Sequence, residues 1–197
     1  MGGQPRTVLQ FPQKNGVLLT PTSGVISSGV YTIVGLFRFD EISGYRKIVD
    51  FKNATADEGL YNHFGLLNFF DSAEGASAVI PAATYVQVVL TRDGSGNVVG
   101  YVNGAQQFAF LDSSNDGVID ASNTLRFFVD DTTTDGLEAS AGAVARIRIF
   151  DTALSAAEVA ALDHPNPAPA PALAPLGLVC VGVILLAVGL RRLRSRV

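Results

Sequence analysis

Acidic residues gather in two loops of this sequence, and carboxylate oxygens are ligands that Ca²⁺ prefers. The first loop has its oxygen-bearing and turn residues at the spacing of a calcium-binding loop: Asp112, Ser114, Asp116, Gly117 and Asp120. Its last ligand position, however, holds Asn123 and not a bidentate glutamate. The flanking residues also have strand patterns and not helical ones. The loop is therefore either a calcium site or a solvated hairpin loop.

The second group of carboxylates follows one strand pattern closely: Asp130, Asp131, Asp135 and Glu138. Carboxylates this close repel each other unless a cation or water lies between them. We therefore expect a cation, most simply Ca²⁺, at this rim of the domain. The alternative is an acidic rim that only solvent covers.

Aromatic side chains provide a third kind of site, because a sugar ring can stack on them while a polar tip forms hydrogen bonds. The candidates for ligand binding are Tyr45, Tyr61 and Phe64, with Phe69 and Phe70 close by. Most aromatic residues at strand spacing belong to a core, so that interpretation stays open for each of them.

The charge distribution excludes one class of partner. All 18 acidic residues lie at or before Asp163, with ten of the 14 basic ones, so this part carries 10 − 18 = −8. The other four are Arg191, Arg192, Arg194 and Arg196. Nucleic acid binding needs clustered Lys and Arg on the domain, so we expect no nucleic acid partner.

The elements that must position these residues are short strands. Their β-branched and aromatic patterns predict strands at 7–11, 30–39, 46–51, 66–70, 85–91, 98–102, 107–111, 125–129 and 144–150. Turn signals separate them, such as Asn103-Gly104. Ser155 and Glu158 form a capping-box pattern that predicts one short helix ending at Leu162. The fold class is therefore all-β, an antiparallel β-sandwich (jelly roll) over residues 1–162.

Three segments carry a family resemblance: 85–104, with its Thr-Arg strand end and Tyr-Val-Asn-Gly; 123–131; and 142–159, a strand followed by the capped helix. They resemble laminin-G-like, concanavalin-A-like (pentraxin-type) jelly-roll domains over roughly residues 5–162. The resemblance implies a recognition fold, often with Ca²⁺ at a rim. Tyr85 stands where the family often has Trp, and Ala145 where it often has Asp, which removes one ligand that the resemblance would supply.

Catalysis is poorly supported by the residues. Glucanases with this sandwich carry a Glu-x-Asp-x-x-Glu strand for retaining hydrolysis, and no such pattern occurs here. Asp40 and Glu41 are adjacent, so on a strand they would face opposite sides. His63 lies in a turn-like segment, and His164 falls in the linker. We expect no enzyme, with a hydrolase as the remaining alternative.

The C-terminal segments differ in composition from the domain. Residues 163–172 form a Pro/Ala-rich linker, which favours an extended stalk. Leu173 to Leu190 is an uncharged run of 18 residues, and as a helix it would span roughly 27 Å, enough for a single transmembrane helix. Arg191 and Arg192 begin a basic cytoplasmic tail over 191–197, which places the domain outside the cytoplasm.

This tail resembles the PEP-CTERM class of bacterial sorting signals, in which a membrane exosortase processes the protein for surface delivery. The Pro-Glu-Pro signature is absent, and Pro165-Asn166-Pro167 or the Pro-Ala repeats stand in its place. A sorting protease is thus an expected partner, and a plain membrane anchor is the alternative. Met1 to Gln10 lacks the apolar stretch of a signal peptide, so we expect either a start upstream of Met1 or insertion directed by the tail helix.

These features together predict a membrane-anchored, surface-displayed binding or adhesion module on the extracytoplasmic face of a bacterial cell. Its partner is expected to be a glycan or another extracellular polymer. The competing prediction is a structural matrix or surface protein that acts by self-association.

Overall fold

The computed structural model describes residues 7–26, 29–163 and 165, all of which belong to one compact unit, Met1–Pro165. The predicted linker from 166 onward, the transmembrane helix between Leu173 and Leu190, and the tail that begins with Arg191 and Arg192 lie outside the described residues. Among the helices in the described part, none is long and apolar enough to cross a membrane.

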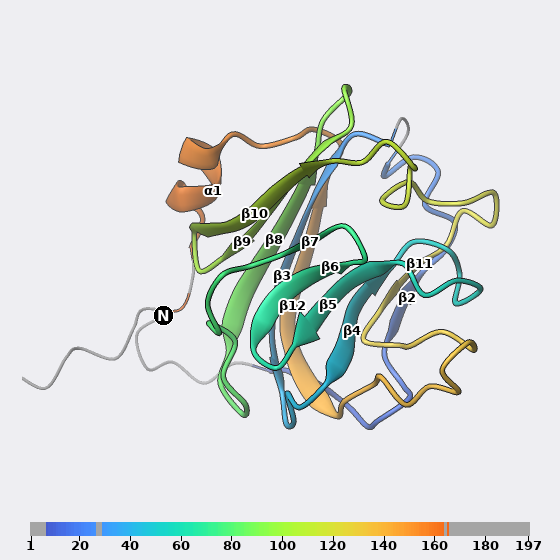
Figure 1. Cartoon of the computed structure of the whole chain (residues 1–197), viewed down its shortest axis with the longest axis vertical. Coiled ribbons are helices and arrows are strands. Elements are labelled where there is room, and N and C mark those ends of the chain that lie inside the picture. The colour runs from blue at the N-terminus through green and yellow to red at the C-terminus, as the bar shows by residue number, and fades with distance from the viewer. Residues whose placement is uncertain (1–6, 27–28, 164, 166–197) are drawn as a thin grey trace, which may run out of the picture. The chain divides into compact units, whose positions relative to one another are not determined.

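In the part of the chain that the structure describes, twelve strands form two six-stranded sheets, and every pairing between neighbouring strands is antiparallel. Sheet A has the order β1 (Leu9–Phe11), β12 (Gly142–Phe150), β3 (Tyr31–Phe39), β8 (Val86–Arg92), β9 (Asn97–Val102) and β10 (Ala105–Leu111). Sheet B has the order β2 (Val17–Leu19), β11 (Leu125–Phe127), β4 (Tyr45–Asp50), β5 (Gly59–His63), β6 (Leu66–Phe70) and β7 (Ala73–Glu74). Figure 1 shows the two sheets packed against each other. The predicted antiparallel sandwich is confirmed.

The core lies between the sheets and follows from alternation along the strands. In β8, Val86, Val88 and Leu90 point into the core, and Leu67 and Phe69 of β6 meet them from sheet B. Stacked and edge-to-face phenylalanines fill one end of this core; the rings of Phe11 and Phe128 lie parallel with 4.5 Å between centroids. A tightly packed core of this kind fixes the face to which each strand residue points.

The predicted helix is confirmed as α1 (Ala156–Ala161). Its capping box is complete, because Ser155 accepts from the Glu158 amide and Glu158 accepts from the Ser155 amide. Val159 is fully buried and packs with Val34 and Val89 on the outer face of sheet A (Figure 1). The helix thus covers part of the outer face of that sheet.

After α1, Asp163 ties the chain back to the outer face of sheet A. Its carboxylate accepts hydrogen bonds from Arg146 Nη1 at 2.6 Å and Arg148 Nη1 at 3.1 Å, both in β12. Its carbonyl oxygen accepts from Gln87 Nε2 in β8 at 2.7 Å. The chain end of the described domain is therefore held by two strands.

Strands β2, β5 and β7 were not predicted. β5 contains Gly59, Asn62 and His63, which are poor strand formers by composition. Gly59 is required here, because its φ is +144° and a Cβ atom would lie 2.5 Å from the Val49 carbonyl oxygen of β4. The turn into β6 uses Phe64 and Gly65, both with positive φ, as a tight hairpin requires.

Candidate functional site

The register of sheet B brings four side chains into one row on its outer face. Lys47 of β4 pairs with Tyr61 of β5, Tyr61 with Asn68 of β6, and Asn68 with Glu74 of β7. Since Leu67 and Phe69 point into the core, the residues that alternate with them point outward. The row therefore crosses four strands on the face opposite the core.

Beside this row, Tyr45 of β4 pairs with His63 of β5. Their rings are parallel, with 4.1 Å between centroids and 10° between planes. Phe70 of β6 stands edge-on to Tyr45, with 5.6 Å between centroids and 83° between planes. The three rings border an open hollow of about 270 Å³ whose full lining is Tyr45, His63, Asn68, Phe70, Asp71, Ser72, Ala73 and Glu74. We call it the ring hollow.

Glu74 fixes the polar side of the ring hollow. Its Oε2 lies 2.6 Å from Nδ1 of His63 and accepts a hydrogen bond from Nδ2 of Asn68 at 3.0 Å. An ionised carboxylate only accepts hydrogen bonds, so Nδ1 of His63 is the donor in this contact when Glu74 is ionised. Glu74 thereby orients both the imidazole ring and the amide.

Next to the ring hollow, the row ends in a fully buried lysine. Nζ of Lys47 donates to Oδ2 of Asp131 and to the Asp57 carbonyl oxygen, both at 3.2 Å, and lies 3.9 Å from Oδ2 of Asp50. It also lies 4.2 Å from the centroid of the Tyr61 ring, a cation–π contact. The ammonium group of Lys47 is thus held in place by nearby oxygen atoms and by the face of one aromatic ring.

The electrostatics around Lys47 follow from burial and crowded carboxylates. Burial, with the nearby carboxylates of Asp57 and Asp130, raises the pKa of Glu138 to about 7 against the opposing effect of Lys47. Burial also tends to raise the pKa of Asp131, but Lys47 and the Thr133 amide outweigh it and the net shift is downward.

The negative charge extends to the ring hollow. Burial raises the pKa of the Tyr45 hydroxyl, and the carboxylates of Glu74, Glu138 and Asp57 add to that shift. The phenol at the edge of the hollow therefore feels three carboxylates. A ligand in the hollow enters a region of negative potential.

The four carboxylates that follow β11 and were predicted to hold a cation do not point toward one common position. Asp131 is buried and turns toward Lys47, while Oδ2 of Asp130 accepts from Thr134 Oγ1 at 2.8 Å and the Glu138 amide at 2.9 Å. Asp135 is exposed, and its carbonyl oxygen accepts from Lys14. Protein groups therefore engage Asp131 and Oδ2 of Asp130, while Oδ1 of Asp130 has no protein partner.

The carboxylates of the first acidic loop also form hydrogen bonds with groups of the protein itself. Asp112 is 4% exposed, and its Oδ2 accepts from Nε of Arg92 at 2.8 Å while its Oδ1 accepts from the Asp116 amide. Asp120 bonds with Ser122. Within residues 7–26, 29–163 and 165, no three His, Cys, Asp or Glu side chains are grouped so that they could hold a metal. Calcium binding by either loop stays a prediction.

The structure places the aromatic residues that were predicted to bind a ligand in different surroundings. Tyr45 lines the ring hollow, and so does Phe70. Tyr61 is fully buried, and its hydroxyl donates to Asp57 at 2.8 Å, so it supports the site without an accessible face. Phe64 is 59% exposed at the β5–β6 turn, where its ring meets His63 edge-on at 5.0 Å. Phe69 belongs to the core.

Sequence reasoning missed His63, Asn68, Asp71 and Glu74. His63 was assigned to a turn, but it is the last residue of β5. Period-two alternation in Tyr61 to His63 and Asn68 to Phe70 was the available signal, and it depends on recognising β5 as a strand.

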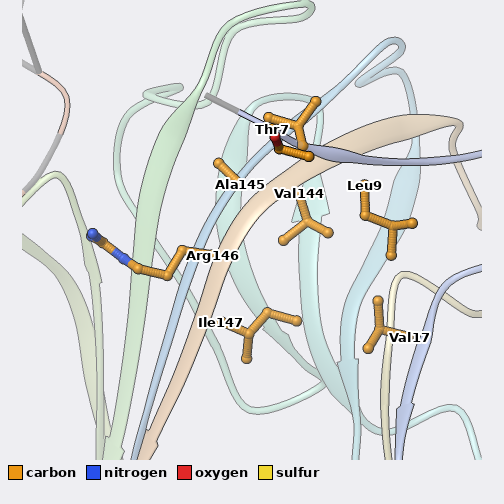
Figure 2. Close-up of a pocket in the computed structure, with 8 residues that line it drawn as sticks. Thr7, Leu9, Val17, Val144, Ala145, Arg146 and Ile147 are labelled. Atoms are coloured by element: carbon orange, nitrogen blue, oxygen red, sulfur yellow. The ribbon is translucent and has the colours of Figure 1, made fainter. Parts of the chain in front are cut away.

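A second hollow of about 400 Å³ opens at the edge of the sandwich. Figure 2 shows Leu9 of β1, Val144 of β12 and Val17 of β2 around it, while the charged end of Arg146 extends away from them. Its lining is mainly aliphatic, so it offers few groups that could orient a polar ligand. The ring hollow is therefore the stronger candidate.

Comparison with known families identifies the superfamily to which the chain belongs. The model of the concanavalin A-like lectin/glucanases superfamily matches residues 13–160. Among curated proteins, none matches the chain.

Solved structures with the same fold include CBM40 of the Ruminococcus gnavus IT-sialidase bound to α2,3-sialyllactose, at TM-score 0.61 and 12% identity, covering 79% of this chain and 96% of that one. Domain 4 of an extracellular arabinanase from Geobacillus stearothermophilus, in complex with arabinotriose, matches at TM-score 0.55 and 15% identity, covering 81% and 82%. A sialidase from Streptococcus pneumoniae matches at TM-score 0.56 and 16% identity over 80% of this chain, but only 28% of its own.

Proposed function

The chain belongs to the concanavalin A-like lectin/glucanases superfamily, and we propose that it is a carbohydrate-binding module whose site is the ring hollow. The observation that carries the proposal is the parallel stack of Tyr45 on His63 beside the edge of Phe70, with Asn68 and Glu74 at the same hollow. Aromatic rings and a few fixed polar groups are what a sugar requires, since its ring faces are apolar and its hydroxyls need partners.

The structural neighbours support a glycan as the ligand class. Two of the similar folds were solved with oligosaccharides, sialyllactose in one and arabinotriose in the other. The neighbours that match over most of their own length are separate modules and not whole enzymes. Because one fold hosts many functions, the proposal depends on the ring hollow and takes only the ligand class from this likeness.

The proposed role is binding and not catalysis. Glu74 is committed to His63 and Asn68, and the sequence has no Glu-x-Asp-x-x-Glu strand. Hydrolysis with retention or inversion needs two carboxyl groups that flank a glycosidic bond with one free to give a proton. Of the two carboxyl groups at the ring hollow, Asp71 and Glu74, Glu74 is already engaged by His63 and Asn68.

We further propose that the module is displayed at a bacterial surface. The uncharged run from Leu173 to Leu190 and the arginines after it support a membrane anchor, with a sorting protease as a partner. Protease added to intact spheroplasts should then remove the domain. Complete protection of residues 7–163 would contradict surface display.

The experiment that tests glycan binding is a glycan array probed with the full-length chain, followed by calorimetry on the strongest binder. Replacing Tyr45 with Ala removes the stacked ring and should weaken binding about tenfold, the size of an aromatic contact of about 1–2 kcal/mol. The matched control is Tyr85→Ala, a partly buried tyrosine that does not line the hollow. Equal losses in both variants, or no binder on the array, would contradict the proposal.

A further inference from the structure

The charges around the ring hollow have one sign. Eight of the described residues line the hollow. Two of them, Asp71 and Glu74, carry carboxylates, and none of the eight is a lysine or an arginine. Asp71 and Glu74 are both exposed to solvent. Glu138 and Asp57 add to the same field, since their charges act on the Tyr45 hydroxyl. A bound ligand therefore faces carboxylates and no free cation of the lining.

The cations close to this face are already committed. Lys47 is fully buried against Asp131 and Tyr61. Nη2 of Arg46 lies 3.2 Å from Oε1 of Glu41, and its Nη1 donates to the Tyr45 carbonyl oxygen at 2.9 Å. His63, the one lining residue that can become cationic, has its Nδ1 on Glu74 at 2.6 Å.

The hydrogen-bonding groups of the hollow are mainly acceptors. Glu74 can accept only, so the Nδ2 side of Asn68 must face it, and this fixes the orientation of the amide. Oδ1 of Asn68 is then left without a partner, although the residue is only 7% exposed. A buried oxygen in this state favours a donor from outside the chain, because an unsatisfied acceptor costs free energy.

From these observations we infer that the ring hollow selects neutral or amine-bearing sugars and excludes sugars that carry a carboxylate. The inference rests on the proposed function and names the ligand class of that site. Hydroxyl and ammonium groups of such sugars can donate to the exposed carboxylates of Glu74 and Asp71. A sugar carboxylate supplies acceptors only, and its recognition normally requires an arginine fork or comparable donors.

The inference separates this chain from the neighbour solved with sialyllactose. A sialic acid carboxylate at the ring hollow would meet two exposed carboxylates with no arginine in the lining to neutralise it. One such like-charge contact at an intermediate effective dielectric weakens affinity by about tenfold. The shared fold therefore does not imply shared ligand charge.

The test is an array of matched glycans probed with the full-length chain. It carries neutral glycans, their sialylated and uronate counterparts, and glucosamine oligomers with free amines. We expect binding to neutral or amine-bearing members, with each acidic counterpart weaker by about tenfold. An acidic glycan that binds as tightly as its neutral partner, and loses binding with Tyr45→Ala, would overturn this inference and leave the proposed function intact. A chain that binds no glycan would overturn both.

Asp71 allows a test of the cause. Its substitution Asp71→Lys changes the sign of an exposed charge at the hollow and should narrow the gap between neutral and acidic glycans by about tenfold. The matched control is Asp93→Lys, an exposed carboxylate at the β8–β9 turn of sheet A that does not line the hollow. Raising the salt from about 0.01 M to about 1 M should also narrow the gap, because it screens the repulsion. A gap unchanged by both Asp71→Lys and salt would contradict the electrostatic origin.

Discussion

Tyr45 and His63 stack face to face because the register of β4 and β5 places their Cα atoms opposite each other. His63 therefore supports the Tyr45 ring and also holds Glu74. We expect His63→Ala to weaken glycan binding about tenfold, because the Tyr45 ring loses the imidazole on which it stacks. Calorimetry with the best array glycan measures this. The control is Phe64→Ala, which removes the exposed neighbouring ring outside the hollow and should leave affinity within about twofold.

Lys47 is expected to dominate the stability of sheet B. Lys47→Met leaves Asp131 and Asp50 buried without their cation, and removing one partner of a buried pair costs about 3–5 kcal/mol. Urea unfolding measures the change in the free energy of unfolding. The control Lys14→Met concerns an exposed lysine and should cost less than about 0.5 kcal/mol. A loss below about 1 kcal/mol for Lys47→Met would show that Lys47 is not needed to neutralise the cluster.

Glu138 predicts a specific pH dependence of stability. Burial, followed by Asp57 and Asp130, raises its pKa from 4.5 to about 7 in the folded protein. The native state then binds a proton that the unfolded state has released, so this contribution is complete below the unfolded pKa and is lost as the pH rises from 4.5 through 7.

Glu138→Gln should therefore stabilise the protein at pH 8 and change little at pH 4. Because the side chain is partly exposed, solvent screening limits the gain to about 1 kcal/mol, or about 2–4 °C in Tm. Thermal melts across this range provide the measurement. Asp135→Asn, an exposed carboxylate of the same loop, serves as the control. A wild-type and a Glu138→Gln curve that stay parallel from pH 4 to pH 8 would contradict the expectation.

Calcium binding by the loop from Asp130 to Glu138 can be tested against the role of Lys47. A cation that binds only the native state adds about 2.7 kcal/mol at a hundred times Kd, or roughly 5–10 °C in Tm for this size. Because Asp131 is paired with Lys47, we expect added Ca²⁺ to raise the Tm of Lys47→Met more than that of the wild type. Melting curves that Ca²⁺ and EDTA leave unmoved in both proteins would show that these carboxylates hold no calcium.

The sandwich itself was predictable from local patterns. Val86, Val88 and Leu90 alternate with residues of the other face, and Ser155 with Glu158 marks the helix start, so both signals lie within a few residues of chain. Such signals locate strands and place their apolar faces. They do not determine which strands become neighbours.

The ring hollow depends on that second kind of information. β5 has little strand propensity, and its place between β4 and β6 is what joins Tyr45, His63 and Asn68. The burial of Lys47 is equally non-local, because lysines are almost never fully buried and its partner Asp131 lies 84 residues away. Two of the carboxylates that resembled metal ligands in the sequence, Asp131 and Asp112, are paired in the fold with Lys47 and Arg92.

The hydrogen bonds of Asp163 with β12 and β8 fix which face of the sandwich holds the end of the described domain. Arg146 and Arg148 alternate with Ile147 and Ile149, which pack toward the core, so Asp163 sits on the outer face of sheet A. The ring hollow lies on the outer face of sheet B. Asp163 and the ring hollow therefore lie on opposite faces of the sandwich, so the contacts of Asp163 with β12 and β8 leave the ring hollow uncovered.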